Sequence, residues 1–134
     1  MSYQGSVYGP ALAAAAGFAG YPLLELLWRG YTHVSMAAAG AICVLGLYVL
    51  NACRPRPGIG LRCVIGGLYI TAVEFLFGVI FNLWLGVGVW DYSDKAFHLL
   101  GQVCPENTLL WMFLSFPVYL LCDQIDRAGS FRRA

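Results

Sequence analysis

Residues 63–87 read CVIGGLYITAVEFLFGVIFNLWLGV, a long apolar run in which Glu74 is the one charged side chain. A helix needs about 20 mostly apolar residues to cross the hydrocarbon core of a bilayer, and this run is longer than that. Such a stretch is typical of a membrane span and not of the surface of a soluble domain. We therefore expect residues 63–87 to form a transmembrane helix.

Three other apolar stretches complete the predicted fold: residues 7–28, 34–50 and the shorter 108–122, which would begin earlier or cross with little tilt. The chain is 60% hydrophobic and 11% charged, whereas soluble domains carry about 25% charged residues. This composition excludes an ordinary water-soluble enzyme, and a net charge of +1 indicates no nucleic-acid partner. We predict an all-α membrane protein whose single domain, residues 1–134, crosses the lipid bilayer four times.

The basic residues predict how these helices are oriented. With four spans, both termini and the loop at residues 51–62 lie on one side of the bilayer, and six of the eight Lys and Arg residues fall there. The positive-inside rule makes that side cytoplasmic. Residues 1–6 lack the basic segment and the cleavage site of a signal peptide. The six basic residues are Arg54, Arg56, Arg62, Arg127, Arg132 and Arg133.

Glu74 lies far from either end of its predicted helix, where an acidic side chain costs about 2.5–3.5 kcal/mol on insertion scales. Gly67, Thr71, Glu74, Gly78 and Asn82 follow one another at spacings of three or four residues, so they share one helix face. Two interpretations stay open. The stripe is either a polar notch that binds a ligand or a set of interhelical hydrogen bonds packed through small residues.

The first two predicted helices carry small residues four positions apart, within residues 13–20 and 37–41, which predict close packing of their backbones. Polar residues follow near the outer end of the first helix. Glu25 and Arg29 are one turn apart and can pair on one face, and His33 opens the second helix. The pair is either a structural anchor of a helix end, or Arg29 serves a pocket at the outer mouth.

Residues 89–107 connect the third and fourth predicted helices. Ser93 is a suitable N-cap and Gly101 a suitable C-terminal stop, so we predict a short interfacial helix that folds across the outer end of the bundle. Phe97 would press into the membrane interface. The alternative is a solvated connecting loop with aromatic residues at the membrane surface.

Polar side chains gather in the outer half of the predicted bundle and in its cover, whereas the inner half is nearly free of them apart from its basic flanks. This asymmetry predicts a polar cavity open to the outside, or a polar plug that holds the helices together. The candidate substrate-binding residues are Glu25, Arg29, His33, Thr71, Glu74, Asn82, Asp91, Tyr92 and Gln102.

Three segments carry a resemblance to a family of small bacterial membrane proteins. Residues 25–36 read Glu-x-x-Trp-Arg-Gly-x-x-His-x-Ser-Met, residues 74–82 read Glu-Phe-x-x-Gly-x-x-x-Asn, and residues 90–104 begin Trp-Asp-Tyr-Ser and end Gly-Gln-x-Cys. Over residues 21–123 the chain resembles the putative ABC transporter permeases, also called putative ABC-transporter type IV. The resemblance implies a multi-pass protein of the bacterial plasma membrane with a role in transport.

An ATPase partner is not supported by the sequence itself. The loop at residues 51–62 contains two prolines and two glycines, and it is too short for the coupling helix that a typical ABC permease presents to its ATPase. The chain also lacks the glycine-rich phosphate loop of an ATP-binding protein. We expect transport, if it occurs, without nucleotide bound to this chain.

The leading functional prediction is a small transport protein, assembled as a homo-oligomer because four short helices enclose little space. Glu74 with Thr71 and Asn82 would bind a cation or a small polar solute, and Arg29 with Glu25 would gate it. The alternative is a non-transporting scaffold or accessory subunit whose buried polar residues are structural. No enzyme, metal site or cofactor is expected, since metal-ligand spacings such as H-E-x-x-H do not occur.

Overall fold

The computed structural model describes residues 8–30, 32–53 and 55–131, with the side chains of all of these except Arg29 and residues 128–131. Within this part of the chain the fold is all-helical, with four helices long and apolar enough to span a membrane, which confirms the predicted fold class. The helices are α1 (Tyr8–Arg29), α2 (Val34–Ala52), α3 (Ile59–Phe77) and α4 (Pro105–Phe131). A π-helical segment, η1 (Gly78–Trp84), continues α3.

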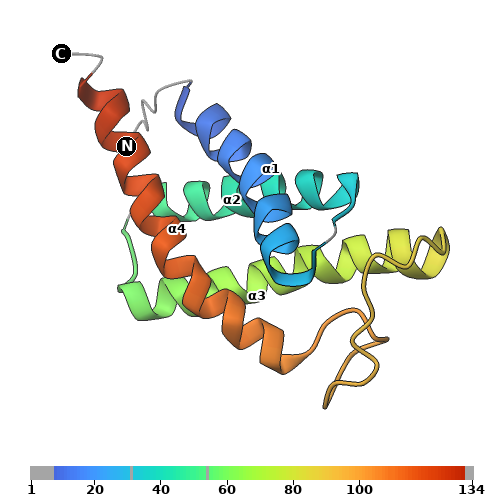
Figure 1. The fold of residues 1–134 in the computed structure, drawn as a ribbon. Coiled ribbons are helices and arrows are strands. Elements are labelled where there is room, and N and C mark those ends of the chain that lie inside the picture. Colours follow the sequence, from blue (N-terminus) through green and yellow to red (C-terminus); the bar gives the residue numbers. More distant parts are fainter. Residues whose placement is uncertain (1–7, 31, 54, 132–134) are drawn as a thin grey trace.

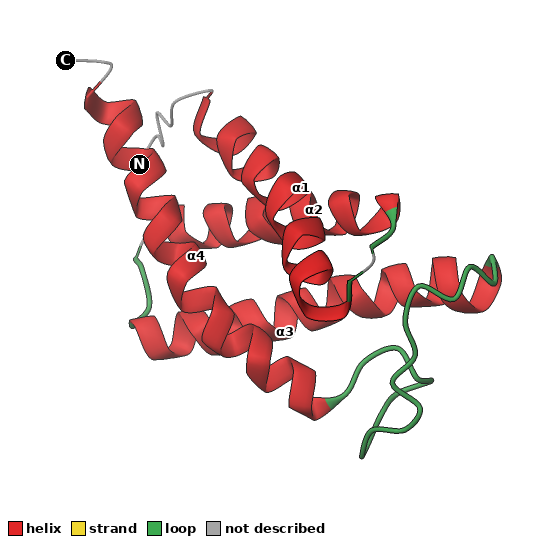
Figure 2. Ribbon diagram, in the orientation of Figure 1, coloured by secondary structure: helices red, strands yellow, loops and turns green. Residues whose placement is uncertain are grey.

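The helices form two crossed pairs. α1 packs mainly against α2, and α4 packs mainly against α3. Figure 1 shows α2 and α3 running side by side while α1 and α4 cross them obliquely. The short connection between α2 and α3 lies at one end of the bundle, and the long loop between η1 and α4 lies at the other (Figure 2). We call this loop, residues 85–104, the lid.

The backbones of α1 and α2 approach each other at Gly17 and Gly40. A Cβ atom added to either glycine would overlap the backbone carbonyl of the other. The predicted close packing through small residues is therefore confirmed for this part of α1. Gly20, one turn further along, has no atom of another element near its Cβ position, so it does not take part in the contact.

Replacement of Gly40 by valine is expected to destabilise the protein, because the added side chain would force α1 and α2 apart. Overpacking of this kind costs about 1–3 kcal/mol. Thermal unfolding in detergent, followed by tryptophan fluorescence, measures the effect. The same substitution at Gly20 is the matched control and should leave the midpoint almost unchanged; equal losses in the two variants would show that the close approach is not what limits stability.

α4 begins before and ends well after the predicted span of residues 108–122. Its first residue is Pro105, whose fixed φ suits the first helical position. At the other end the helix continues through polar residues because they have partners on α2. Asn51 donates to Asp123 over 2.8 Å, and the Tyr48 hydroxyl donates to Asp126 over 2.6 Å. These tertiary contacts keep a polar stretch helical.

The lid does not contain the predicted interfacial helix. Residues 93–101 form turns, and Phe97, Leu100 and Gly101 have φ values of 57°, 54° and 72°. Such left-handed backbone cannot continue an α-helix. The segment folds back on itself instead, with the Tyr92 amide donating to the Gly101 carbonyl over 2.7 Å. Gly101 therefore serves a tight reversal and not a helix end.

Candidate functional site

The Glu74 carboxylate joins three elements. It projects from α3 and is buried, with 5% of the residue exposed. The Tyr92 hydroxyl of the lid donates to Oε1 over 3.0 Å, and the Trp111 indole Nε1 of α4 donates to Oε2 over 2.9 Å. Both donors are neutral, so they satisfy the carboxylate oxygens without supplying a positive charge.

The surroundings of Glu74 are aromatic and dry. Tyr21 of α1 stacks on Trp111, with ring centroids 5.5 Å apart and planes inclined by 29°. Beside them a narrow gap runs past the carboxylate, and it does not admit a water molecule. The site is therefore closed in this conformation. The side chains that line the gap are Tyr21, Met36, Ala39, Cys43, Ile70, Val73, Glu74 and Trp90.

A second set of hydrogen bonds attaches the lid to η1. The Asn82 amide donates to Gln102 Oε1 over 2.8 Å, while its own oxygen accepts the Val89 backbone N–H over 2.6 Å. Gln102 is buried, and its backbone carbonyl accepts the indole N–H of Trp90 over 2.9 Å. A Cβ at Gly78 would overlap the Gln102 side chain, so this glycine makes room for the lid.

The inner part of the stripe joins α3 to α4. The hydroxyls of Thr71 and Thr108 lie 2.8 Å apart, and Thr71 also donates to the Gly67 carbonyl. The side chain of Met112 packs against Gly67, where a Cβ would collide with it. The stripe of residues predicted from the spacing along α3 therefore faces α4 and the lid. It makes the interhelical hydrogen bonds of one of the two predicted interpretations.

The sequence of this chain matches a known protein family. The family model described as "Putative ABC-transporter type IV" matches residues 17–129, which include most of α1, all of α2, α3 and the lid, and α4 except its last two residues. The chain belongs to that family. No curated protein and no solved structure matches it. The name of the type IV family is that of a transporter, so membership agrees with a multi-pass membrane protein of transport type.

In this family member, His33 and Asp91 have local structural roles away from Glu74. His33 is the N-cap of α2, and its Nδ1 accepts the Ser35 backbone N–H over 3.1 Å. Asp91 is exposed, and its carboxylate accepts the Ser93 backbone N–H over 2.9 Å. Hydrogen bonds from the Ser93 side chain and backbone hold the pKa of Asp91 below its ordinary value.

The predicted pair of Glu25 and Arg29 is only partly within the described residues. Glu25 is half-buried on α1. The side chain of Arg29 lies outside the described part, so its pairing with Glu25 stays a prediction. Thr71, Glu74, Asn82, Tyr92 and Gln102 are the predicted site residues that hydrogen bonds place along one side of α3 and η1.

Trp111 is a site residue that the sequence reasoning missed. A carboxylate in the middle of a span needs donors from other helices, and Trp111 supplies one from near the start of the fourth predicted span. The indole N–H of Trp111 marks it in the sequence as a possible donor to a buried carboxylate, although the sequence does not show which face of the helix it occupies. No cluster of three His, Cys, Asp or Glu side chains that could hold a metal occurs in residues 8–30, 32–53 and 55–131.

The end of the bundle opposite the lid carries a second polar cluster, just outside the predicted spans of residues 34–50, 63–87 and 108–122. Arg62 is buried at the start of α3, and its guanidinium donates to Asn51 Oδ1 of α2 and to the Pro57 carbonyl. Asn51 donates in turn to Asp123 of α4, which also pairs with Arg56 at 3.2 Å. We call these side chains, Asn51, Arg56, Arg62 and Asp123, the inner cluster.

Proposed function

We propose that this chain is a small multi-pass transport protein of the bacterial plasma membrane, with both termini in the cytoplasm, that binds a cation or a small polar solute at Glu74. Membership of a transporter-type family supports the general class. The observation that carries the proposal is the hydrogen bond from Tyr92 in the lid to the buried Glu74 carboxylate. It links a carboxylate within the membrane span to a loop that lies outside the span.

In the proposed mechanism the described conformation is the closed state. Tyr92 occupies Oε1 of Glu74, and Trp111 occupies Oε2. Outward movement of the lid withdraws the Tyr92 hydroxyl and leaves Oε1 open to a ligand that arrives from the lid side. A cation or a donor group of a polar solute would then take the place of the Tyr92 hydroxyl at Oε1. A ligand that binds better to the open state shifts the population toward it.

The other predicted site residues take supporting roles in this proposal. Asn82 and Gln102 hold the closed lid on η1, and Thr71 supplies a hydroxyl below the carboxylate. Glu25 and Arg29 at the end of α1 would gate the outer mouth. Because the gap at Glu74 does not admit water, we propose that a homo-oligomer provides the further wall that a transport path needs.

Coupling to an ATPase is not part of the proposal. α2 ends at Ala52 and α3 begins at Ile59, so six residues connect the two helices. Two of them, Pro55 and Pro57, lack a backbone N–H. A connection of this length and composition offers no surface helix to an ATPase subunit.

The test of the proposal is Glu74→Gln, which keeps the size of the side chain and removes its charge. Purified protein is screened by thermal unfolding against inorganic cations, organic amines and small polar solutes, and hits are then tested for uptake into proteoliposomes. A ligand at 100 times its Kd stabilises a protein by about 2.7 kcal/mol. We expect this stabilisation and the uptake in wild type, and the loss of both in Glu74→Gln.

Asp94→Asn is the matched control, because Asp94 is an exposed carboxylate outside the candidate membrane spans. It should respond to the same ligand as wild type does. Equal stabilisation and uptake in Glu74→Gln would remove Glu74 from the transport site.

A non-transporting scaffold or accessory subunit is the second candidate function. It is favoured by two observations: Glu74 lies beside a gap too narrow for water, and its carboxylate already accepts hydrogen bonds from Tyr92 and Trp111. Under this alternative, Glu74→Gln and Glu74→Ala lower the unfolding midpoint, and no solute in the screen raises the midpoint of wild type. The same screen therefore separates the two functions.

A further inference from the structure

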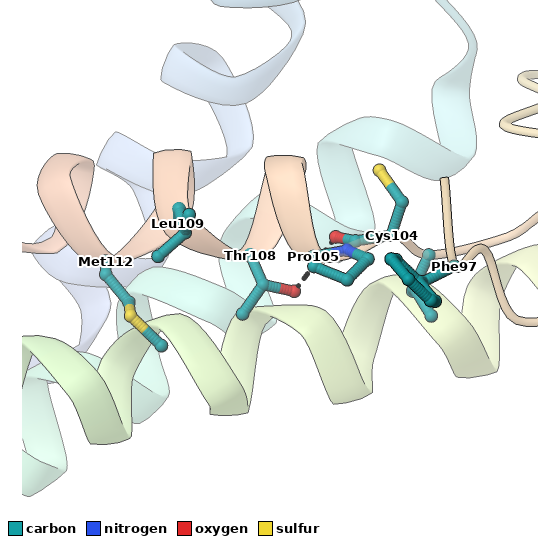
Figure 3. A pocket seen from close by; sticks show the side chains of 7 residues that line it. Phe97, Cys104, Pro105, Thr108, Leu109 and Met112 are labelled. Atoms are coloured by element: carbon teal, nitrogen blue, oxygen red, sulfur yellow. Dashed lines mark hydrogen bonds between the residues drawn. The ribbon is translucent and has the colours of Figure 1, made fainter. Parts of the chain in front are cut away.

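An apolar groove of about 460 Å³ runs along the first two turns of α4, beside α3. Figure 3 shows Pro105, Thr108, Leu109 and Met112 following one another along α4, with the α3 ribbon below and Phe97 of the lid at the far end. The volume falls within the range of about 300–1,000 Å³ that is usual for ligand pockets. The groove is open along its length.

The groove lies in the apolar surface of a candidate membrane span. It follows the start of the span Pro105–Arg127; Leu109, which lines it, and Phe113, one turn further along α4, are both exposed and apolar. Phe97 lines the lid end of the groove. Of this residue 91% is exposed, and its φ is 57°. A non-glycine residue in left-handed backbone is uncommon, and the exposed ring offers an apolar surface to a hydrocarbon chain in the groove.

Two opposite charges lie next to the lid end of the groove. Lys95 is two residues before Phe97, and Glu106 directly follows Pro105. Their charged groups are 3.6 Å apart, and both side chains are exposed. An ammonium and a carboxylate at this spacing match the phosphate and the ammonium of a zwitterionic phospholipid headgroup.

We propose that the groove binds one acyl chain of a zwitterionic phospholipid, with the phosphate toward Lys95 and the headgroup ammonium toward Glu106. The bound chain packs against Leu109, Met112 and the Phe97 ring. The lipid thereby covers the outer face of the lid and holds it against α4. This site is separate from Glu74 and does not depend on the proposed transport function.

The test uses native mass spectrometry of the full chain in detergent, with added phosphatidylethanolamine or phosphatidylglycerol of the same acyl composition. Leu109→Trp fills the groove, and Phe97→Ala removes its end wall at an exposed position where folding is not at risk. Phe113→Trp makes a matched change one turn further along α4, outside the groove. Thermal unfolding without lipid checks that each variant is folded.

We expect wild type and Phe113→Trp to retain one phosphatidylethanolamine per chain, at least tenfold more often than phosphatidylglycerol. Retention should fall at least tenfold in Leu109→Trp and in Phe97→Ala. In Lys95→Gln/Glu106→Gln the preference between the two headgroups should disappear. Undiminished retention in both groove variants would overturn the proposal. So would a change of oligomeric state in these variants without a change in lipid, because the groove would then be a contact between copies of the chain.

Discussion

Replacement of Asn51 by leucine is expected to lower the free energy of unfolding by about 3 kcal/mol, the scale observed when one partner of a buried charged group is removed. Asn51 is 1% exposed and lies between the guanidinium of Arg62 and the carboxylate of Asp123. Leucine fills a similar volume but neither donates nor accepts. Arg62 then loses its side-chain acceptor, and Asp123 loses a donor.

Unfolding in detergent with increasing denaturant, followed by tryptophan fluorescence, measures this loss. Asn107→Leu is the control, because Asn107 is half-buried at the opposite end of α4, outside the inner cluster. Arg62→Met combined with Asn51→Leu should cost less than the two single changes together, since the double variant no longer buries a charge without its acceptor. A loss below about 0.5 kcal/mol in Asn51→Leu would mean that the inner cluster does not hold the three helices together.

The sequence predicted the elements of this fold better than their contacts. Apolar length located the four spans, and the period of 3.6 placed Glu74, Gly78 and Asn82 on the face that meets α4 and the lid. The donors to Glu74 could not be found in the same way. Trp111 is 37 positions away, and which face of α4 it occupies depends on packing between helices, which local periodicity does not encode.

The two errors have a common physical origin. Ser93 and Gly101 matched a helix with normal caps. However, the Trp90 indole before this segment donates to the Gln102 carbonyl after it, and Asn82 donates to the Gln102 side chain, so the segment is held in a reversal. Likewise, Asp123 looked like the polar end of a span, yet its bond to Asn51 keeps it within α4. In both places tertiary hydrogen bonds override the local preference of the chain.

Removal of the Asn82 side-chain amide is expected to release the lid. Asn82→Leu deletes two hydrogen bonds, one to Gln102 Oε1 and one from the Val89 backbone N–H. Each buried group left without its partner costs about 1–3 kcal/mol. A total of about 2 kcal/mol or more corresponds to a roughly 30-fold increase in the population of the open lid, since about 1.4 kcal/mol is tenfold in an equilibrium constant.

Cys104 reports this opening, because it lies at the base of the lid and is 3% exposed. When the lid closes faster than a thiol reacts, the rate of modification by a water-soluble maleimide follows the open population. Mass spectrometry assigns the modification to Cys104 and separates it from the exposed Cys53. Asn82→Leu should raise the rate at Cys104 roughly 30-fold, whereas Leu83→Ala, at an exposed neighbour in η1, should leave it unchanged. A wild-type rate in Asn82→Leu would show that the hydrogen bonds of Asn82 do not hold the lid closed, and that other contacts, such as the bond from Tyr92 to Glu74, do so.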